Sequence, residues 1–350
     1  MQRLLDRHGC PGVLVAVVPQ DGEASVYAVG HANAARSAPM DRALRMRIGS
    51  VSKLFVGAAL LRCVDDGVVS LDARVSNYLP GVPGGDQITL RMLGKHTSGL
   101  PDPIRSPRFR VEVMKTPARF WKPSEVLQFC YRLRPVSNPG EQVRYSNVGA
   151  VLLAEALAAA AEKSFAELMK ETVLTPLGLR DTGYCSAAAP PGPTCSAYRF
   201  ARRGEWLSYG RYFTEVTGHS ASWSSWAGDM YSTIHDLSKA APQLLTGRLL
   251  SDRGRRELFD WRQGSDSVTR HGILIKQTTL GIGHDGDVPG FSAAVWRSPR
   301  EGQCVIVLAN LCTTTTGDSP ANRVAEYLLS ATAEAESPTL PGKQAGLGNQ

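Results

Sequence analysis

A serine and a lysine three positions apart, Ser50 and Lys53, have the types and spacing that most directly suggest chemistry. Apolar residues at i, i+3 and i+4 from Val51 to Leu61 predict a helix with one buried face that Ser50 begins. One turn brings the lysine amine within reach of the serine hydroxyl. A lysine shielded from water has a lowered pKa and can act as the base that a serine nucleophile needs. Because Ser-x-x-Lys occurs about once by chance in such a chain, a capping serine beside a solvated lysine is the competing interpretation.

Two further motifs occur once each and follow in order along the chain. Tyr145-Ser146-Asn147 stands between the Pro139-Gly140 turn and a predicted helix, so Tyr145 could relay a proton and Asn147 could bind Lys53 and an acyl amide. Helix capping by Asn147 and interfacial packing of Tyr145 are the alternatives. His284-Asp285-Gly286 is the third motif, although a single histidine is more often structural than catalytic.

With these three motifs, the sequence resembles the class C β-lactamase, DD-carboxypeptidase and related esterase group from about Pro11 to Leu329. The resemblance also covers the residues around the motifs and several other segments: Arg47 to Lys53, Val69 to Asp72, Tyr78 to Pro80, His96 to Pro101, Tyr145 to Gly149, Leu177 to Leu179 and Gly283 to Phe291.

The resemblance implies a role for each motif. Ser50 would be the nucleophile, Lys53 and Tyr145 the general base system, and Asn147 a substrate ligand. His284 and Gly286 would form the third motif, and the N–H groups of Ser50 and Asp287 would line the oxyanion hole.

The third motif departs from the lactamase pattern, in which Lys-Thr-Gly is usual, and this favours peptidase, amidase or esterase chemistry over β-lactam hydrolysis. Asp285 and Asp287 stand where similar DD-peptidases carry hydroxyl residues, so an anionic substrate end is disfavoured unless a cation offsets them. Lys276 is a candidate for that cation, with a solvated strand charge as the alternative. Trp223 resembles a cleft-lining aromatic, with core packing as the alternative.

The hydrophobic periodicities predict an α/β (α+β) chain, and the resemblance implies the β-lactamase/transpeptidase-like fold. Strands are expected in two groups, and the two chain ends are expected to share one antiparallel sheet: Val13 to Val18, Ser25 to Val29, Gly272 to Lys276, Phe291 to Trp296 and Cys304 to Ala309. The expected helices are Val51 to Asp66, Ser124 to Leu133, Val148 to Glu162, Phe165 to Val173, Ile234 to Leu245 and Asn322 to Leu329. We expect a sheet domain from 1–55 and 247–335, a mostly helical domain from 56–246, and a disordered tail from 336–350.

Composition excludes several classes of protein. The chain is 43% hydrophobic and has a net charge of +7, but its arginines are scattered, so a nucleic-acid partner is not expected. Its seven cysteines show no Cys-x-x-Cys pair, so no metal is expected. A Cys185–Cys195 disulfide is conceivable but disfavoured by the cytoplasmic location that the start of the sequence suggests, unless the true start lies upstream. No membrane span is expected.

Gly281 to Gly286 fits Gly-x-Gly-x-x-Gly, but a strand rather than a helix is predicted after it, so no dinucleotide cofactor is expected. The expected function is therefore a serine hydrolase that cleaves an ester or amide in a small molecule or peptide through a Ser50 acyl-enzyme. An acyltransferase using the same residues and a catalytically silent ligand-binding protein remain open as alternatives.

Overall fold

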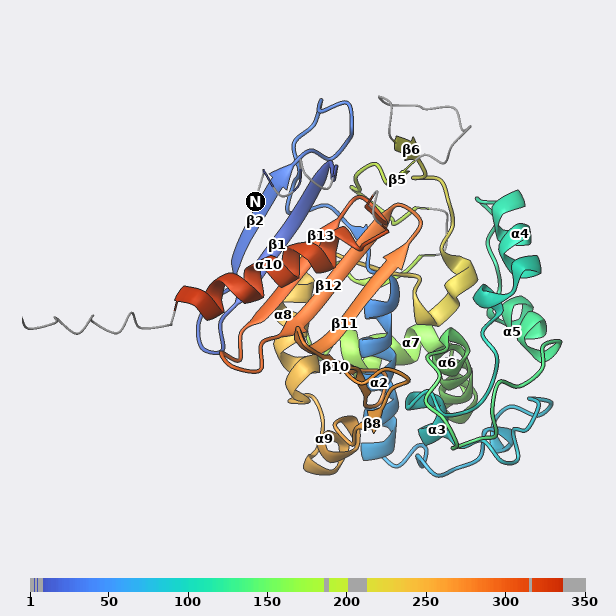
Figure 1. The fold of residues 1–350 in the computed structure, drawn as a ribbon. Coiled ribbons are helices and arrows are strands. Elements are labelled where there is room, and N and C mark those ends of the chain that lie inside the picture. The colour runs from blue at the N-terminus through green and yellow to red at the C-terminus, as the bar shows by residue number, and fades with distance from the viewer. Residues whose placement is uncertain are drawn as a thin grey trace, which may run out of the picture.

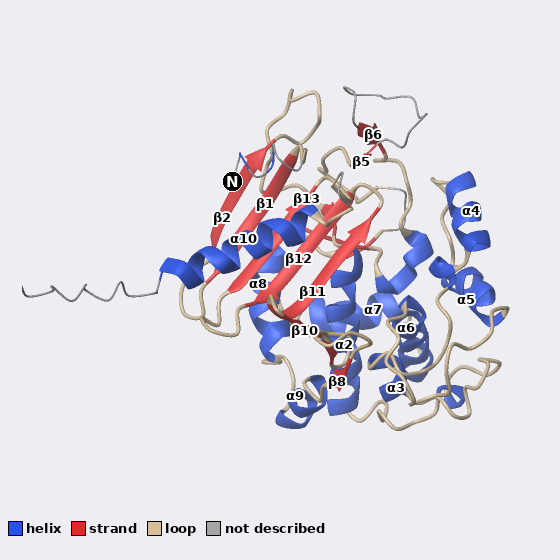
Figure 2. Ribbon diagram, in the orientation of Figure 1, coloured by secondary structure: helices blue, strands red, loops and turns tan. Residues whose placement is uncertain are grey.

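The computed structural model describes residues 3, 5, 9–185, 189–200, 213–314 and 317–335. Its centre is an eight-stranded antiparallel sheet that combines both ends of the chain, as expected (Figures 1 and 2). In spatial order the strands are β2 (Ser25–Gly30), β1 (Gly12–Val18), β13 (Cys304–Ala309), β12 (Phe291–Arg297), β11 (Gly281–Val288), β10 (Lys276–Thr278), β9 (Arg270–His271) and β8 (Arg262–Gln263).

Side chains alternate between the two faces of the central strands, so each of these strands contributes to two separate hydrophobic cores. In β13, Val305 and Val307 pack beneath α10 (Pro320–Ala335), whereas Ile306 and Leu308 belong to the larger core on the opposite face. The same rule applies to β11, where Val288 lies in the larger core and Asp285 contacts α10 through Asn322. Because side chains alternate between the faces of a strand, His284 and Gly286 face the larger core.

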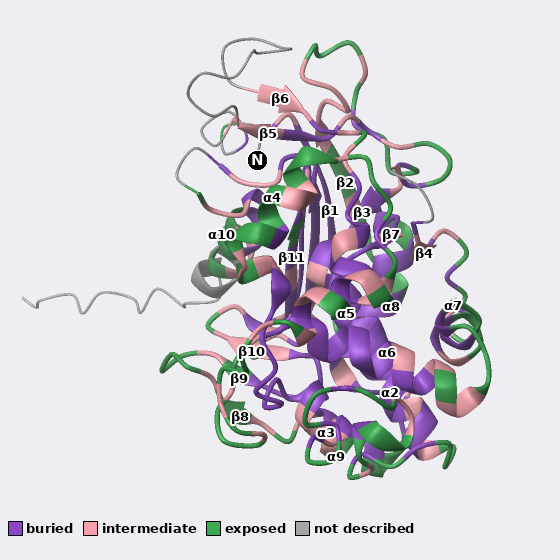
Figure 3. Cartoon of the chain, turned by 90° about the vertical axis from the view of Figure 1, so that its right-hand side faces the viewer, coloured by how far each residue is buried: buried purple, intermediate pink, exposed green. Residues whose placement is uncertain are grey.

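The helix that carries the first motif, α2 (Ser52–Asp65), is buried on nearly all sides rather than on one face, which corrects the expectation of an amphipathic helix. It packs between the sheet and α6 (Asn147–Ala161), and both helices are coloured mostly as buried in Figure 3. A helix that is apolar all round belongs in the middle of a core. Ser50 lies just before it, in a 3₁₀ turn from Gly49 to Val51.

The remaining helices surround these two. α8 (Ile234–Thr246) packs on β1, β12 and β13, and this contact favours placing it with the sheet; the division into two domains stays a proposal. The others are α3 (Leu90–Gly94), α4 (Pro107–Lys115), α5 (Pro123–Tyr131), α7 (Phe165–Met169), which continues as a π-helical turn to Leu174, and α9 (Asp252–Leu258). Short strands complete the fold: β3 (Met46–Arg47), β4 (Gly183–Tyr184), β5 (Tyr198–Phe200), β6 (Phe213–Glu215) and β7 (Met230–Ser232).

One predicted strand, Gly272 to Lys276, is wrong in its bounds. Residues 272–275 form a bend, because Leu274 has a φ of +53° and the N–H groups of Ile273 and Leu274 bond to Leu258 and Gly94 instead of a neighbouring strand. The strand β10 therefore begins only at Lys276. The expected tail, 336–350, lies outside the described residues.

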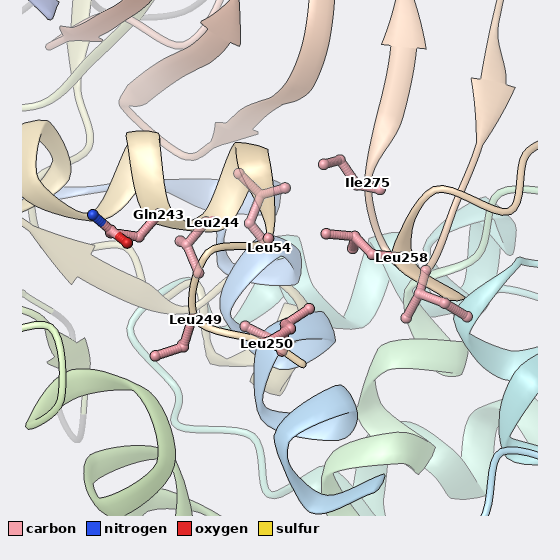
Figure 4. Close-up of a pocket in the computed structure, with 10 residues that line it drawn as sticks. Leu54, Gln243, Leu244, Leu249, Leu250, Leu258 and Ile275 are labelled. Atoms are coloured by element: carbon pink, nitrogen blue, oxygen red, sulfur yellow. The ribbon is translucent and has the colours of Figure 1, made fainter. Parts of the chain in front are cut away.

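Tight packing leaves a small apolar cavity between α2, α8 and α9, shown in Figure 4. Leu54, Leu244 and Leu258 are among the residues that line it. Its volume of about 10 Å³ has room for one water molecule at most, so this cavity is a packing gap and not a ligand site.

Candidate active site

The 3₁₀ turn that carries Ser50 is held at both ends. Ser52 Oγ donates to the Gly49 carbonyl at 2.6 Å and accepts from the Met230 N–H at 3.3 Å, and the Ile48 N–H donates to the Met230 carbonyl. Gly49 has a φ of +52°, a conformation that favours glycine. These contacts fix the Ser50 hydroxyl just before α2. Ser50 was expected to begin the α-helix, and it lies instead in the 3₁₀ turn that precedes the helix.

Lys53 lies one turn further on and is fully buried. Its Nζ atom is 2.9 Å from Ser50 Oγ, 2.8 Å from Asn147 Oδ1 and 2.8 Å from the Ala227 carbonyl oxygen. Burial lowers the pKa of the amine to about 7, and the nearby carboxylate of Asp102 partly opposes that shift. A substantial fraction of Lys53 is therefore uncharged near neutral pH, and the solvated-lysine interpretation is wrong.

The orientation of Asn147 is fixed from behind by Asp102. Asp102 Oδ2 accepts from the Asn147 backbone N–H at 2.8 Å and from its side-chain Nδ2 at 3.0 Å. Since Nδ2 is committed to this carboxylate, the amide oxygen must face Lys53. An uncharged lysine amine has two N–H groups. These donate to Asn147 Oδ1 and to the Ala227 carbonyl oxygen, so the lone pair of Nζ points at Ser50 Oγ. The contacts thus orient Lys53 to take the serine proton.

Tyr145 is packed among histidines beside Ser50. Its ring centroid lies 4.7 Å from that of His96 and 5.9 Å from that of His284, and its hydroxyl hydrogen-bonds to the Ser50 side chain. Burial raises the pKa of the tyrosine well above its usual value. The hydroxyl is therefore protonated at neutral pH and can donate or relay a proton, while Lys53 is the available base.

The third motif brings the edge of β11 against the serine turn. A Cβ atom at Gly286 would lie 2.3 Å from the Ile48 carbonyl oxygen and 2.5 Å from the Ser50 nitrogen, so only glycine fits there. A Cβ at Gly49 would lie 2.9 Å from the Asp287 nitrogen. The backbones of Ser50 and Asp287 are therefore neighbours, as an oxyanion hole built from their N–H groups requires.

His284 is buried and uncharged, because desolvation lowers its pKa well below the usual value. Its Nδ1 lies 2.5 Å from the Asp285 carbonyl oxygen, while its Nε2 has no hydrogen-bond partner among the described residues. A buried nitrogen of this kind is suited to bond a substrate group.

Lys276 does not face the site as a free cation. Its amine forms an ion pair with Asp285, whose other oxygen accepts from Asn322 Nδ2 at 3.0 Å. The neighbouring Lys276 charge holds the pKa of Asp285 below its usual range, although burial acts in the opposite direction. Lys276, the candidate for the cation that offsets the two aspartates, is thus paired with Asp285.

The model of the family described as Beta-lactamase matches residues 1–329. The chain belongs to the beta-lactamase family. Among relatives, the D-alanyl-D-alanine-carboxypeptidase/endopeptidase AmpH of Escherichia coli K12 is 31% identical over 279 residues, which are 75% of this chain and 63% of AmpH. The chain therefore spans less than two thirds of this relative.

Two solved structures of this fold resemble the protein over nearly its whole length. The D-amino acid amidase from Ochrobactrum anthropi SV3 in complex with L-phenylalanine has a TM-score of 0.82 and 25% identity, with 96% of this chain and 99% of the amidase covered. The D-stereospecific amidohydrolase from a Streptomyces species has a TM-score of 0.80 and 25% identity, with 93% and 97% covered.

Other predicted features of this beta-lactamase-family chain have mixed outcomes. Trp223 lines a surface pocket and also packs near Phe109 and Trp121, and its contact with substrate stays a prediction. Cys185 and Cys195 are both free thiols, and no disulfide joins them. The Gly-x-Gly-x-x-Gly run lies within strand β11 and leads into β12, which cannot supply a helix N-terminus for a pyrophosphate.

Sequence reasoning missed two contributors to the site. Asp102 follows the recognised His96 to Pro101 segment, and its position before Pro103 reads as a helix cap, a role it also fills by accepting from the Ile104 N–H. Ala227 acts through its carbonyl oxygen, which residue type does not reveal. No group of three or more potential metal ligands occurs within the described ranges. In the same part of the chain, the helices are too short or too polar to span a bilayer.

Proposed function

We propose that this protein is a serine hydrolase that cleaves an ester or amide bond through an acyl-enzyme on Ser50. The observation that carries the proposal is the 2.9 Å contact between Lys53 Nζ and Ser50 Oγ, in an amine whose other contacts are fixed by Asn147 and Ala227. The names of the amidase and carboxypeptidase relatives support the same reaction class.

In the proposed reaction, Lys53 takes the Ser50 proton as Oγ forms a bond to the acyl carbon. The N–H groups of Ser50 and Asp287 stabilise the negative oxygen of the tetrahedral intermediate. The intermediate then collapses, the bond to the leaving group breaks, and Tyr145 passes the proton to the departing nitrogen or oxygen. Water, deprotonated by the same groups, attacks the acyl-enzyme and releases the acid.

The ion pair between Lys276 and Asp285 supports a choice of substrate. Because Lys276 is already neutralised, a leaving group that ends in a free carboxylate has no unpaired cation to bind at this position. We propose that neutral or cationic amides and esters, such as D-amino acid amides and simple esters, are better substrates than free-acid peptides. The amidase and amidohydrolase structures support this choice.

Intact-protein mass spectrometry with a fluorophosphonate probe tests the nucleophile. The native protein should gain the mass of one phosphonyl group, and Ser50→Ala should gain none while keeping its circular dichroism spectrum. Ser76→Ala is the matched control, since Ser76 is an exposed serine in the turn Val75–Asn77 and makes none of the contacts that hold the Ser50 turn. A native protein that neither reacts with the probe nor hydrolyses p-nitrophenyl esters or D-amino acid amides would instead support the silent ligand-binding alternative.

A further inference from the structure

A pocket of about 550 Å³ opens beside the C-terminal end of β11. One wall is the face of α4 that carries Arg110, Val113 and Met114, and another is the turn after Asp287. Trp223 also lines the pocket. Its volume lies within the range of small-molecule sites, and its mixture of apolar walls and a few charges is typical of them.

The position of the pocket along β11 assigns it to one side of the scissile bond. Asp287, which lines the pocket, has its backbone beside the Ser50 turn. The Lys276–Asp285 ion pair lies nearer the middle of the strand, where Lys276 is paired with Gly283. The acyl group and the leaving group extend in opposite directions from the carbonyl carbon. If the leaving group lies near Lys276, the acyl group therefore occupies this pocket.

Two basic side chains and one acidic side chain, those of Arg110, Arg199 and Asp287, line the pocket together with His219. Burial of the carboxyl group raises the pKa of Asp287 to about 7, although the residue as a whole remains accessible. His219 is kept uncharged near neutral pH because burial lowers its pKa. Arg199 donates to the Phe200 carbonyl at 3.3 Å.

Arg110 and its neighbour Arg108 are the two arginines of α4, and neither forms an ion pair with the residues that the structure describes. Lys115 and Arg119 form ion pairs with Glu112 and Glu125. Val113 and Met114 follow it at i+3 and i+4, so one face of α4 presents an apolar stretch and a guanidinium group together. A guanidinium group binds a carboxylate through two parallel hydrogen bonds.

We infer that this pocket binds the acyl group of the substrate and that Arg110 selects acyl groups with an apolar stem and a terminal carboxylate. The inference rests on the proposed function and specifies the acyl half of its substrate. Acyl chains without the carboxylate contact the same apolar walls of the pocket but lack the contact with Arg110.

Mono-p-nitrophenyl esters that share one leaving group test this inference. The acyl groups are hexanoate, the adipate half-ester with its terminal carboxylate, and trimethylammoniohexanoate, with glutarate and suberate half-esters to vary the reach. We expect kcat/KM to be highest for one of the half-esters and lowest for the cationic ester. Arg110→Gln should lower the ratio of the half-ester kcat/KM to the hexanoate kcat/KM about three- to fivefold, as expected for an accessible ion pair. Added salt should reduce the preference in the native enzyme.

Arg108→Gln is the matched control, because Arg108 is exposed on the same helix but does not line the pocket. It should leave all the ratios unchanged. Equal rates for the charged and neutral esters, or a preference for the cationic ester through Asp287, would overturn the inference while the proposed hydrolase function stands. Absence of p-nitrophenolate release from every ester would reject the proposed function itself.

Discussion

Replacing Asp102 by asparagine removes a negative charge from behind Asn147 with little change in side-chain volume. The hydrogen bonds of 2.8 Å and 3.0 Å on either side of the Asn147 amide place the carboxylate about 7 Å from the Lys53 amine. At an effective dielectric constant near 20, this separation corresponds to about 2 kcal/mol, or between one and two pKa units. Asp102 favours the charged amine, so its removal lowers the pKa of Lys53 from about 7. The charges of Lys276 and Asp285, which also act on Lys53, are unchanged.

The assay is p-nitrophenyl acetate hydrolysis as a function of pH, followed at the wavelength where product absorbance does not depend on pH. The acidic limb of kcat/KM reports the free enzyme's base. In Asp102→Asn we expect this limb to move to lower pH by at least about one unit. We also expect the plateau to fall by about tenfold or more, because Asn147 loses the carboxylate that fixes its orientation.

Asp66→Asn, at the solvent-exposed end of α2, is the control and should change neither limb nor plateau. Thermal unfolding of both variants separates a folding defect from a change at the site. An acidic limb that stays in place, or moves to higher pH, would refute the assignment of Lys53 as the base under the influence of Asp102. A loss of plateau activity alone would show that the carboxylate positions Asn147 without acting on the lysine charge.

Three further predictions follow from the same contacts. Tyr145→Phe should lower kcat by about two orders of magnitude in steady-state ester hydrolysis, since it removes the proton relay; an unchanged kcat would assign that role to Lys53 alone. Gly286→Ala should lower the free energy of unfolding in urea by about 1–3 kcal/mol and reduce activity, because its Cβ would overlap Ile48 and Ser50, and normal stability would contradict the close approach of β11. Asp285→Thr should free Lys276, so the kcat/KM of a free-acid D-dipeptide should rise relative to the matching amide, and an unaltered ratio would show that this ion pair does not face the substrate.

The sequence was sufficient to predict the outer frame of the fold. The hairpin of β1 and β2 and the strands β12 and β13 are rich in β-branched, aromatic or other apolar residues, and each is found close to its expected bounds. The strand β11 was not predicted, because three glycines, a histidine and two aspartates give it no apolar alternation. Its conformation is set by pairing with β12 and by contact with the Ser50 turn, neither of which is local in sequence.

The three motifs predicted which side chains would meet, and the structure brings Ser50, Lys53, Tyr145 and Asn147 into contact. Lys276 was expected as a candidate to offset the charges of Asp285 and Asp287, and the structure pairs it with Asp285. The partner of Lys276 depends on the register between β10 and β11, which pairs Lys276 with Gly283 and brings Asp285 alongside. The role of Asp102 depends on a loop that returns to the start of α6. Both are tertiary contacts that residue spacing does not encode.

The joining of the two chain ends in one sheet also has a consequence for biosynthesis. Val13 pairs with Ala309, and the Gly12 N–H bonds to Asn310 Oδ1 across 298 residues. A ribosome that has finished α2 must add roughly 240 more residues before β13 begins, which takes roughly 10–50 s at typical elongation rates. Within that interval the sides of α2 that pack on α6 and on β11 stay uncovered until each of these elements has been made. The serine and its base are made first, but β11, the edge that completes their site, is made roughly 200 residues later.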